Sequence, residues 1–95
     1  MGLFGDKDLR KLDTEVTGVC VSVKMATSGV MPVERVESVV NDSAHEIIEL
    51  VRRLDAKGKR GETDAKLAKL TSTDPVEEEM LSRVRAAIDS QVGAR

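Results

Sequence analysis

His45 is the only histidine in this chain, so its surroundings decide which metal chemistry is conceivable. The run HEIIE over 45–49 differs from the zinc-protease pattern because Glu49 stands where the second histidine ligand belongs. Asp42 precedes His45 by three residues, which is the carboxylate–histidine spacing of di-iron helical bundles. A symmetric dimer could double that pair, with Glu46 or Glu49 supplying further carboxylates. A solvated histidine on a polar helix face is the favoured interpretation, so the sequence predicts no metal and no cofactor.

The nucleophiles of the chain lack the surroundings that would activate them. No glycine-flanked elbow surrounds Ser22, Ser38 or Ser43, and the sequence contains neither a GxxxxGK[ST] loop nor a GxGxxG fingerprint. Cys20 is the only cysteine, so a disulfide within the chain is impossible. A small buried hydrophobe is the favoured role for it, ahead of a reactive thiol or a disulfide between subunits. The sequence therefore predicts a protein that is not an enzyme.

A basic stretch at 52–60 is the best candidate for a nucleic-acid site. Asp55 is its only acidic residue, and a cationic helix end followed by a glycine-rich loop could bind phosphates. The chain has a net charge of −2 and no aromatic residue in this stretch for base stacking, and cations also compensate the dipole at a helix end. Nucleic-acid binding is therefore the second hypothesis, carried by Arg52, Arg53, Lys57, Lys59 and Arg60.

The elements that would position these residues are helices. From Val33 to Leu54 the apolar residues recur at steps of three and four, with one gap at Ser43 and Ala44, which predicts an amphipathic helix over 32–57 ending at Gly58. An equally regular rhythm from Leu9 to Val30 predicts a coiled-coil-like helix over 6–28.

One part of the first helix has a second interpretation. The residues of 16–25 also alternate and are rich in β-branched types around Gly18, as in a strand. The helix is favoured because no other segment offers a good partner strand, but the sequence leaves the question open.

The C-terminal third begins with 58–73, a loop in which Thr63 is expected to cap a short helix. Asp74 and Pro75 then predict the start of a helix over 75–92 that Gly93 ends. At the other end, 1–5 is expected to be a flexible apolar arm. The whole chain, 1–95, is predicted to be one all-α domain: an antiparallel helical hairpin plus a C-terminal helix, a small three-helix bundle that oligomerisation could complete.

Composition narrows the functional classes. The chain is 40% hydrophobic with a single aromatic residue, so a monomer would have a thin core and association with another chain would stabilise it. No apolar run is long enough to cross a bilayer and no signal peptide is recognisable, so we expect a cytoplasmic protein without membrane contact.

We expect a small intracellular interaction module: an adaptor, regulator or assembly component of the bacterial or phage-accessory type. Its partner would be a second copy or a larger protein, with nucleic acid less favoured. The residues expected to form interface and core together, two roles that the sequence does not separate, are Leu9, Val16, Val23, Val36, Val40, Ile47, Leu50 and Leu54.

Overall fold

The computed structural model describes residues 6–93, and every regular element in that range is a helix. The helices are α1 (Lys7–Thr27), α2 (Val33–Ala56), α3 (Arg60–Leu67) and α4 (Pro75–Val92). The predicted all-α fold is confirmed, and the segment 16–25 is helical. The predicted apolar arm, 1–5, lies outside the described residues.

The long helices begin and end at residues suited to those positions. The Asp6 carboxylate accepts a hydrogen bond from the Asp8 amide at 2.7 Å and caps α1. Pro32, expected as the first residue of the second helix, is the residue before it, because α2 begins at Val33. Gly58 has a φ of 76°, the left-handed conformation predicted for the end of this helix.

The predicted start of the short third helix is wrong. Thr63 does not cap it, because α3 begins at Arg60 and Thr63 is fully buried within the helix. Its hydroxyl donates a hydrogen bond backwards to the Lys59 carbonyl at 2.7 Å, as threonine does inside helices. The end of α2 is therefore joined to α3 by only the short connection 57–59.

The start of the C-terminal helix follows the sequence prediction. Asp74 accepts hydrogen bonds from the amides of Val76 and Glu77 at 2.9 and 3.0 Å, and Pro75 is the first helical residue. One turn later, Glu78 accepts hydrogen bonds from the Ser72 amide and from Arg85. These contacts hold the connection 68–74 against α4.

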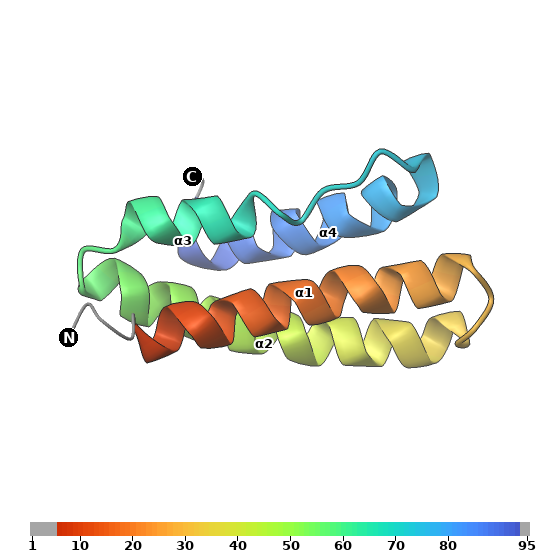
Figure 1. Ribbon diagram of the computed structural model, residues 1–95, viewed down its shortest axis with the longest axis horizontal. Helices are drawn as coiled ribbons and strands as arrows, with labels where there is room; N and C mark the ends of the chain where they lie inside the picture. The colour runs from red at the N-terminus through yellow and green to blue at the C-terminus, as the bar shows by residue number, and fades with distance from the viewer. Residues whose placement is uncertain (1–5, 94–95) are drawn as a thin grey trace.

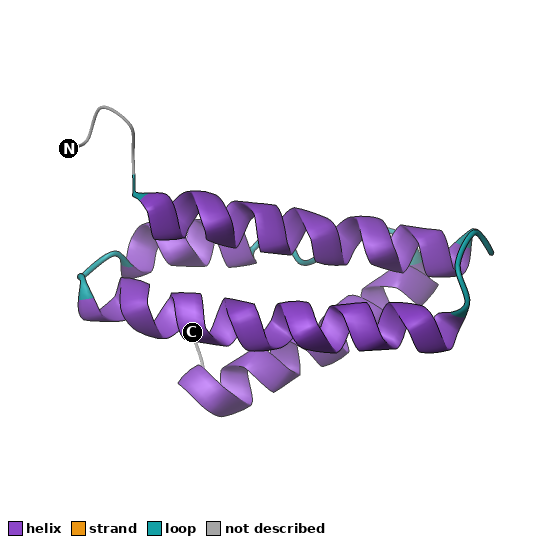
Figure 2. Cartoon of the chain, turned by 90° about the horizontal axis from the view of Figure 1, so that it is seen from below, coloured by secondary structure: helices purple, strands orange, loops and turns teal. Residues whose placement is uncertain are grey.

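The helices pack side by side around one core. In Figure 1, α1 and α2 run alongside each other and are joined at one end by the turn 28–32. Helices α3 and α4 both lie along one side of this pair. Figure 2 shows that α4 crosses α2 obliquely. The buried apolar residues from α1, α2, α4 and the segment after α3 are Leu12, Val16, Val19, Val23, Val36, Val40, Ile47, Ile48, Leu50, Val51, Leu54, Leu70, Leu81, Val84 and Ile88.

Candidate functional site

The residues predicted to form interface and core together lie inside this chain. Leu9 is half-buried and packs against the core, and Val40 is 9% exposed. The remaining predicted positions are buried, namely Val16, Val23, Val36, Ile47, Leu50 and Leu54. A partner that approaches the folded chain therefore meets other residues first, and the interface role of this set stays a prediction.

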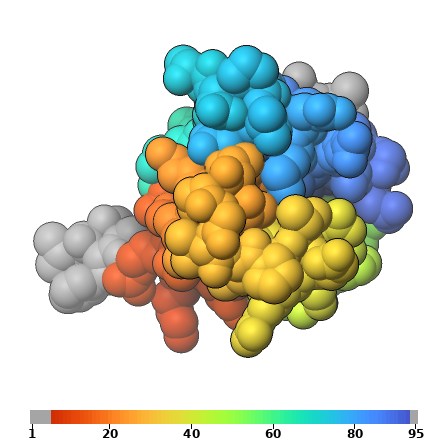
Figure 3. Space-filling model, turned by 90° about the vertical axis from the view of Figure 1, so that its right-hand side faces the viewer, coloured from red at the N-terminus to blue at the C-terminus, as the bar shows by residue number. Residues whose placement is uncertain are grey.

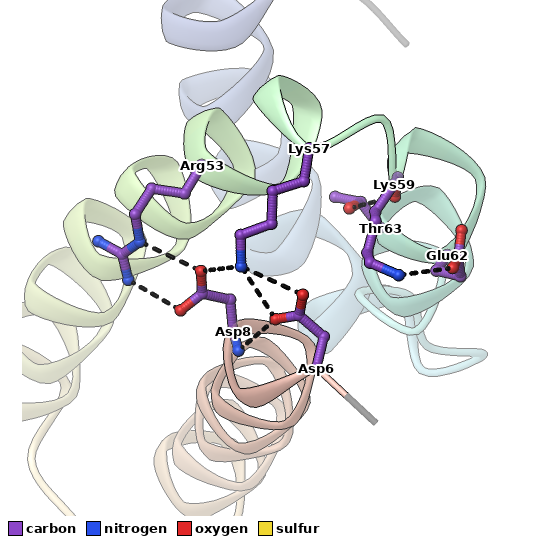
Figure 4. Close-up of polar contacts among 7 residues, drawn as sticks. All are labelled: Asp6, Asp8, Arg53, Lys57, Lys59, Glu62 and Thr63. Atoms are coloured by element: carbon purple, nitrogen blue, oxygen red, sulfur yellow. Dashed lines mark hydrogen bonds and ion pairs between the residues drawn. The ribbon is translucent and has the colours of Figure 1, made fainter. Parts of the chain in front are cut away.

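Two of the predicted nucleic-acid-binding cations are paired with carboxylates at the start of α1 (Figure 4). Arg53 donates two hydrogen bonds to Asp8 at 3.3 Å each, and Lys57 lies 2.8 Å from Asp8 and 3.1 Å from Asp6. The hydrogen bonds from Arg53 and Lys57 lower the pKa of Asp8 to about 2, and the bond from Lys57 lowers the pKa of Asp6. We call these four residues the clasp, because they fasten the end of α2 to the start of α1.

The other cations of the predicted basic site point to different neighbours. Lys59 lies 3.8 Å from Glu62 on α3. Arg52 lies 3.8 Å from Glu49, and its Nη2 donates to the Gln91 carbonyl at the end of α4 at 3.2 Å. Arg60 is the first residue of α3. The five cations are therefore spread over the end of the molecule, and each of Arg52, Arg53, Lys57 and Lys59 has an anionic neighbour.

A groove lies along α2 on the side that faces α4. It consists of two adjoining hollows, of about 260 and about 490 Å³, which share the lining residues Asn41, Ala44 and Ala87. Its floor is apolar and is formed mainly by Val40, Ala44 and Ile48 of α2 and by Met80, Val84 and Ala87 of α4. We call this feature the α2/α4 groove.

The rim of the α2/α4 groove is polar and charged. Glu37 and Arg83 border the first hollow, while His45, Glu49 and Arg52 border the second. His45 is exposed, as expected for a solvated residue on a helix face. The α2/α4 groove thus combines an apolar floor with a charged rim.

The apolar pattern of the sequence does not predict this groove, but one feature of α2 is related to it. The break in the three–four spacing of apolar residues along α2 includes Ala44. Ala44 and Ala87 are the small residues that line both hollows. A methyl group on each side of a helix contact leaves space that a leucine or valine would fill. Only the packing of α4 against α2, however, brings these two alanines to the same place.

A second group of exposed apolar residues lies at the end of the molecule shown in Figure 3, where the α1–α2 turn and the start of α4 face the viewer. Val30 in the turn is 73% exposed, Val33 is the first residue of α2, and Val76 is the second residue of α4. Thr27 donates a hydrogen bond to Glu77 at 3.3 Å and links the two segments. These valines line neither of the hollows described above.

Cys20 lies on the side of α1 that faces the segment after α3. Its thiol is half-buried and lies 3.4 Å from the Lys69 carbonyl oxygen. Burial raises the pKa of this thiol, which disfavours the reactive thiolate. Within residues 6–93, no three or more histidine, cysteine, aspartate or glutamate side chains are gathered to hold a metal ion. No helix in the same range has the length and apolar character needed to cross a membrane.

Within residues 6–93 the structure is all-helical, with a groove of apolar floor between α2 and α4. No known protein family, no curated protein and no solved structure matches this chain.

Proposed function

We propose that this protein is a small, non-enzymatic, cytoplasmic module for protein–protein interaction that binds its partner through the α2/α4 groove. The observation that supports the proposal is the apolar floor of the groove, which includes Ala44 and Ala87 and is bordered by a charged rim. Burying such a floor contributes roughly 25 cal/mol per Å² of apolar surface, and the rim charges would orient the partner. The module would act as an adaptor, regulator or assembly component, and a partner helix would complete the bundle.

The nucleic-acid hypothesis has less support. Arg53 and Lys57 are held by Asp8 and Asp6 in the clasp, so binding phosphates with them would break ion pairs that the fold uses. Lys59 and Arg60 are the cations of this stretch that lie outside both the clasp and the groove. They offer few contacts for a mode of binding whose affinity grows with the number of neutralised phosphates.

Photocrosslinking from single positions tests the proposal. A photoreactive residue replaces Ala87 on the groove floor or, as a matched control, the exposed Ala65 on α3, in cells that produce the protein. We expect irradiation to join a protein to position 87 and not to position 65. Absence of a protein adduct at position 87, or equal adducts at both positions, would refute a groove-centred interaction.

The same experiment separates the two hypotheses. A photoreactive residue at Arg60 should yield nuclease-sensitive adducts only if the basic stretch binds nucleic acid. Binding of that kind should weaken steeply as sodium chloride rises from about 0.05 to about 0.5 M, whereas apolar association should not. The double variant Lys59→Ser/Arg60→Ser should remove it and leave both the clasp and the groove intact.

A further inference from the structure

The exposed side of α1 carries cations and no carboxylate. The three acids of this helix are half-buried, namely Asp8, Asp13 and Glu15. Exposed residues follow one another along the helix at steps of three and four and so form one stripe. These residues are Lys7, Arg10, Thr14, Thr17, Val21 and Lys24. At 1.5 Å per residue the stripe is about 26 Å long, so it is a positively charged surface on a single helix.

Two lysines extend this surface from the neighbouring chain segment. Lys66 of α3 and Lys69 after it lie 3.5 and 3.0 Å from the same oxygen of Asp13, and the Cys20 thiol lies 3.4 Å from the Lys69 carbonyl oxygen. Asp13 precedes Thr17 by four residues and Cys20 follows it by three, so this segment lies beside the middle of the stripe. We call the charged residues gathered here the α1/α3 basic face: Lys7, Arg10, Lys24, Lys66, Lys69 and Asp13.

The positive charges of the α1/α3 basic face are not balanced within the described part of the chain. The three cations of the stripe form no ion pair with any residue of 6–93, and the other two lysines share the single carboxylate of Asp13. Five cations thus accompany one carboxylate, although the chain as a whole has a net charge of −2. The charges of the molecule are therefore segregated, and this face is its basic side.

The charges that border the face do not cancel it. Lys11 lies 3.3 Å from a glutamate of α2, so Lys11 and Glu15, one turn later, belong to the side of α1 that faces α2. Lys59 lies 3.8 Å from Glu62 at the start of α3, and this pair adds no net charge. At the far end of α1, Glu77 accepts hydrogen bonds from two hydroxyl groups. One bordering carboxylate therefore remains against the excess of cations.

The composition of the face favours the phosphate backbone of a nucleic-acid duplex over other polyanions. Lysine, arginine and threonine side chains are common phosphate contacts in such complexes. The stripe has no aromatic ring on which the bases of a single strand would stack. Its one apolar side chain is Val21, whereas a helix that lies on a membrane needs a whole apolar face.

We propose that the α1/α3 basic face binds the phosphate backbone of double-stranded nucleic acid without reading its sequence. This inference goes beyond the proposed function, because the face shares no residue with the α2/α4 groove. A chain with both surfaces can hold a protein in the groove while it is bound to nucleic acid. The site is also distinct from the stretch 52–60, since its cations come from α1 and from 66–69.

Fluorescence anisotropy with a short, labelled DNA duplex tests this binding over a range of sodium chloride concentrations. Because bound phosphates release counterions, the logarithm of the association constant should fall with that of the salt concentration, with a slope of about −3 to −4. Arg10→Ser/Lys24→Ser should weaken binding roughly 30-fold at about 0.1 M sodium chloride and reduce the slope by about 2. The matched control, Lys11→Ser/Arg35→Ser, removes the same charge from exposed residues outside the face and should bind within about threefold of wild type.

Asp13→Asn gives a readout in the opposite direction. The substitution removes the one carboxylate of the face, so binding to the duplex should tighten roughly fivefold. A purely structural role of Asp13 predicts no such gain, because the variant loses its ion pairs with Lys66 and Lys69. Circular dichroism of each variant establishes that the helices remain folded. Unchanged or weaker binding by a folded Asp13→Asn chain contradicts the proposal.

The other outcomes are equally decisive. No binding to the duplex at about 0.05 M sodium chloride would overturn the proposal, as would equal weakening by the matched control. Lys59→Ser/Arg60→Ser should leave binding intact, and if it abolishes binding instead, the site is the stretch 52–60. Binding to phosphatidylserine vesicles but not to the duplex would assign the face to a membrane and overturn the proposal too. The crosslink at position 87 tests the groove separately, so either proposal can fail alone.

Discussion

The two flanks of α2 differ in how completely they are filled. On the α1 side, Val16 and Val19 are fully buried, and the edge is closed by ion pairs of Lys11 with Glu46 and of Asp8 with Arg53, each 3.3 Å long. On the α4 side, Val84 and Ile88 are buried, but the hollows of the α2/α4 groove remain beside them. We call the first flank the α1/α2 seam.

The difference follows from side-chain volume. Along the α1/α2 seam, valine, leucine and isoleucine alternate on helices that run side by side for most of their length (Figure 1). On the other flank alanines face the contact, and α4 crosses obliquely, as Figure 2 shows. One helix can therefore pack into a closed core on one side and leave an open groove on the other, because Ala44, in the gap of its apolar pattern, lines that groove.

The largest effect should come from removing volume on the α1/α2 seam. Leu50 is fully buried between Glu46 and Arg53, which both pair with α1, so Leu50→Ala leaves a cavity in this seam. We expect a loss of about 2–5 kcal/mol of unfolding free energy. Chemical denaturation followed by circular dichroism measures it, since the chain has no tryptophan or tyrosine for fluorescence.

The matched control for Leu50→Ala is Val39→Ala, which shortens a side chain of the same helix that is 40% exposed. Its stability should stay within about 0.5 kcal/mol of wild type. Equal losses in the two variants would show that the α1/α2 seam is not packed as the structure describes.

Adding volume should separate the two flanks. Val16→Leu enlarges a fully buried side chain and should cost about 1–3 kcal/mol, because the seam has no space for another methylene group. Ala87→Leu adds a larger group on the groove floor, where the residue is exposed. Its unfolding free energy, measured at low protein concentration, should be unchanged within about 0.5 kcal/mol or increased.

The same two variants can contradict the comparison. If Ala87→Leu destabilises the chain as much as Val16→Leu does, the groove is already filled in the isolated molecule and has no room for a partner. If Ala87→Leu is stable but weakens association, the groove is open and used.

Local signals were sufficient for much of the fold. Asp74 with Pro75 predicted the start of α4, and the three–four spacing predicted α1 and α2, because caps and periodicity depend on residues within a turn or two. Thr63 was assigned wrongly because the same hydroxyl can cap a helix or bond backwards inside one, and burial against the core decides between the two.

The candidate site depended on contacts between distant segments, which local patterns do not contain. The spacing identified which faces of α1 and α2 are apolar, but an apolar face has the same pattern whether its own chain or another chain covers it. The carboxylates that pair with Arg53 and Lys57 are far from them in the sequence, in Asp6 and Asp8 at the start of α1. The groove itself required the position of α4.

Acid should weaken both the α1/α2 seam and the attachment of the 68–74 connection to α4, by an amount smaller than either core substitution. The clasp lowers the pKa of Asp8 to about 2, and hydrogen bonds from Arg85, Ser72 and Thr71 lower the pKa of Glu78 on α4 to about 2 as well. Since folding lowers both pKa values, the stability that these two carboxylates contribute is complete above their unfolded-state pKa values, near 4, and is lost as the pH falls towards 2.

Asp8→Asn should remove the part of this pH dependence that arises at the α1/α2 seam, and Glu78→Gln should remove the part that arises where the 68–74 connection is attached to α4. Thermal unfolding between about pH 5 and pH 2 measures both, with Glu62→Gln, an exposed residue of α3, as the control. Curves for Asp8→Asn that parallel the wild type across this range would show that the clasp does not stabilise the seam, and the closed flank would then depend on its apolar packing alone.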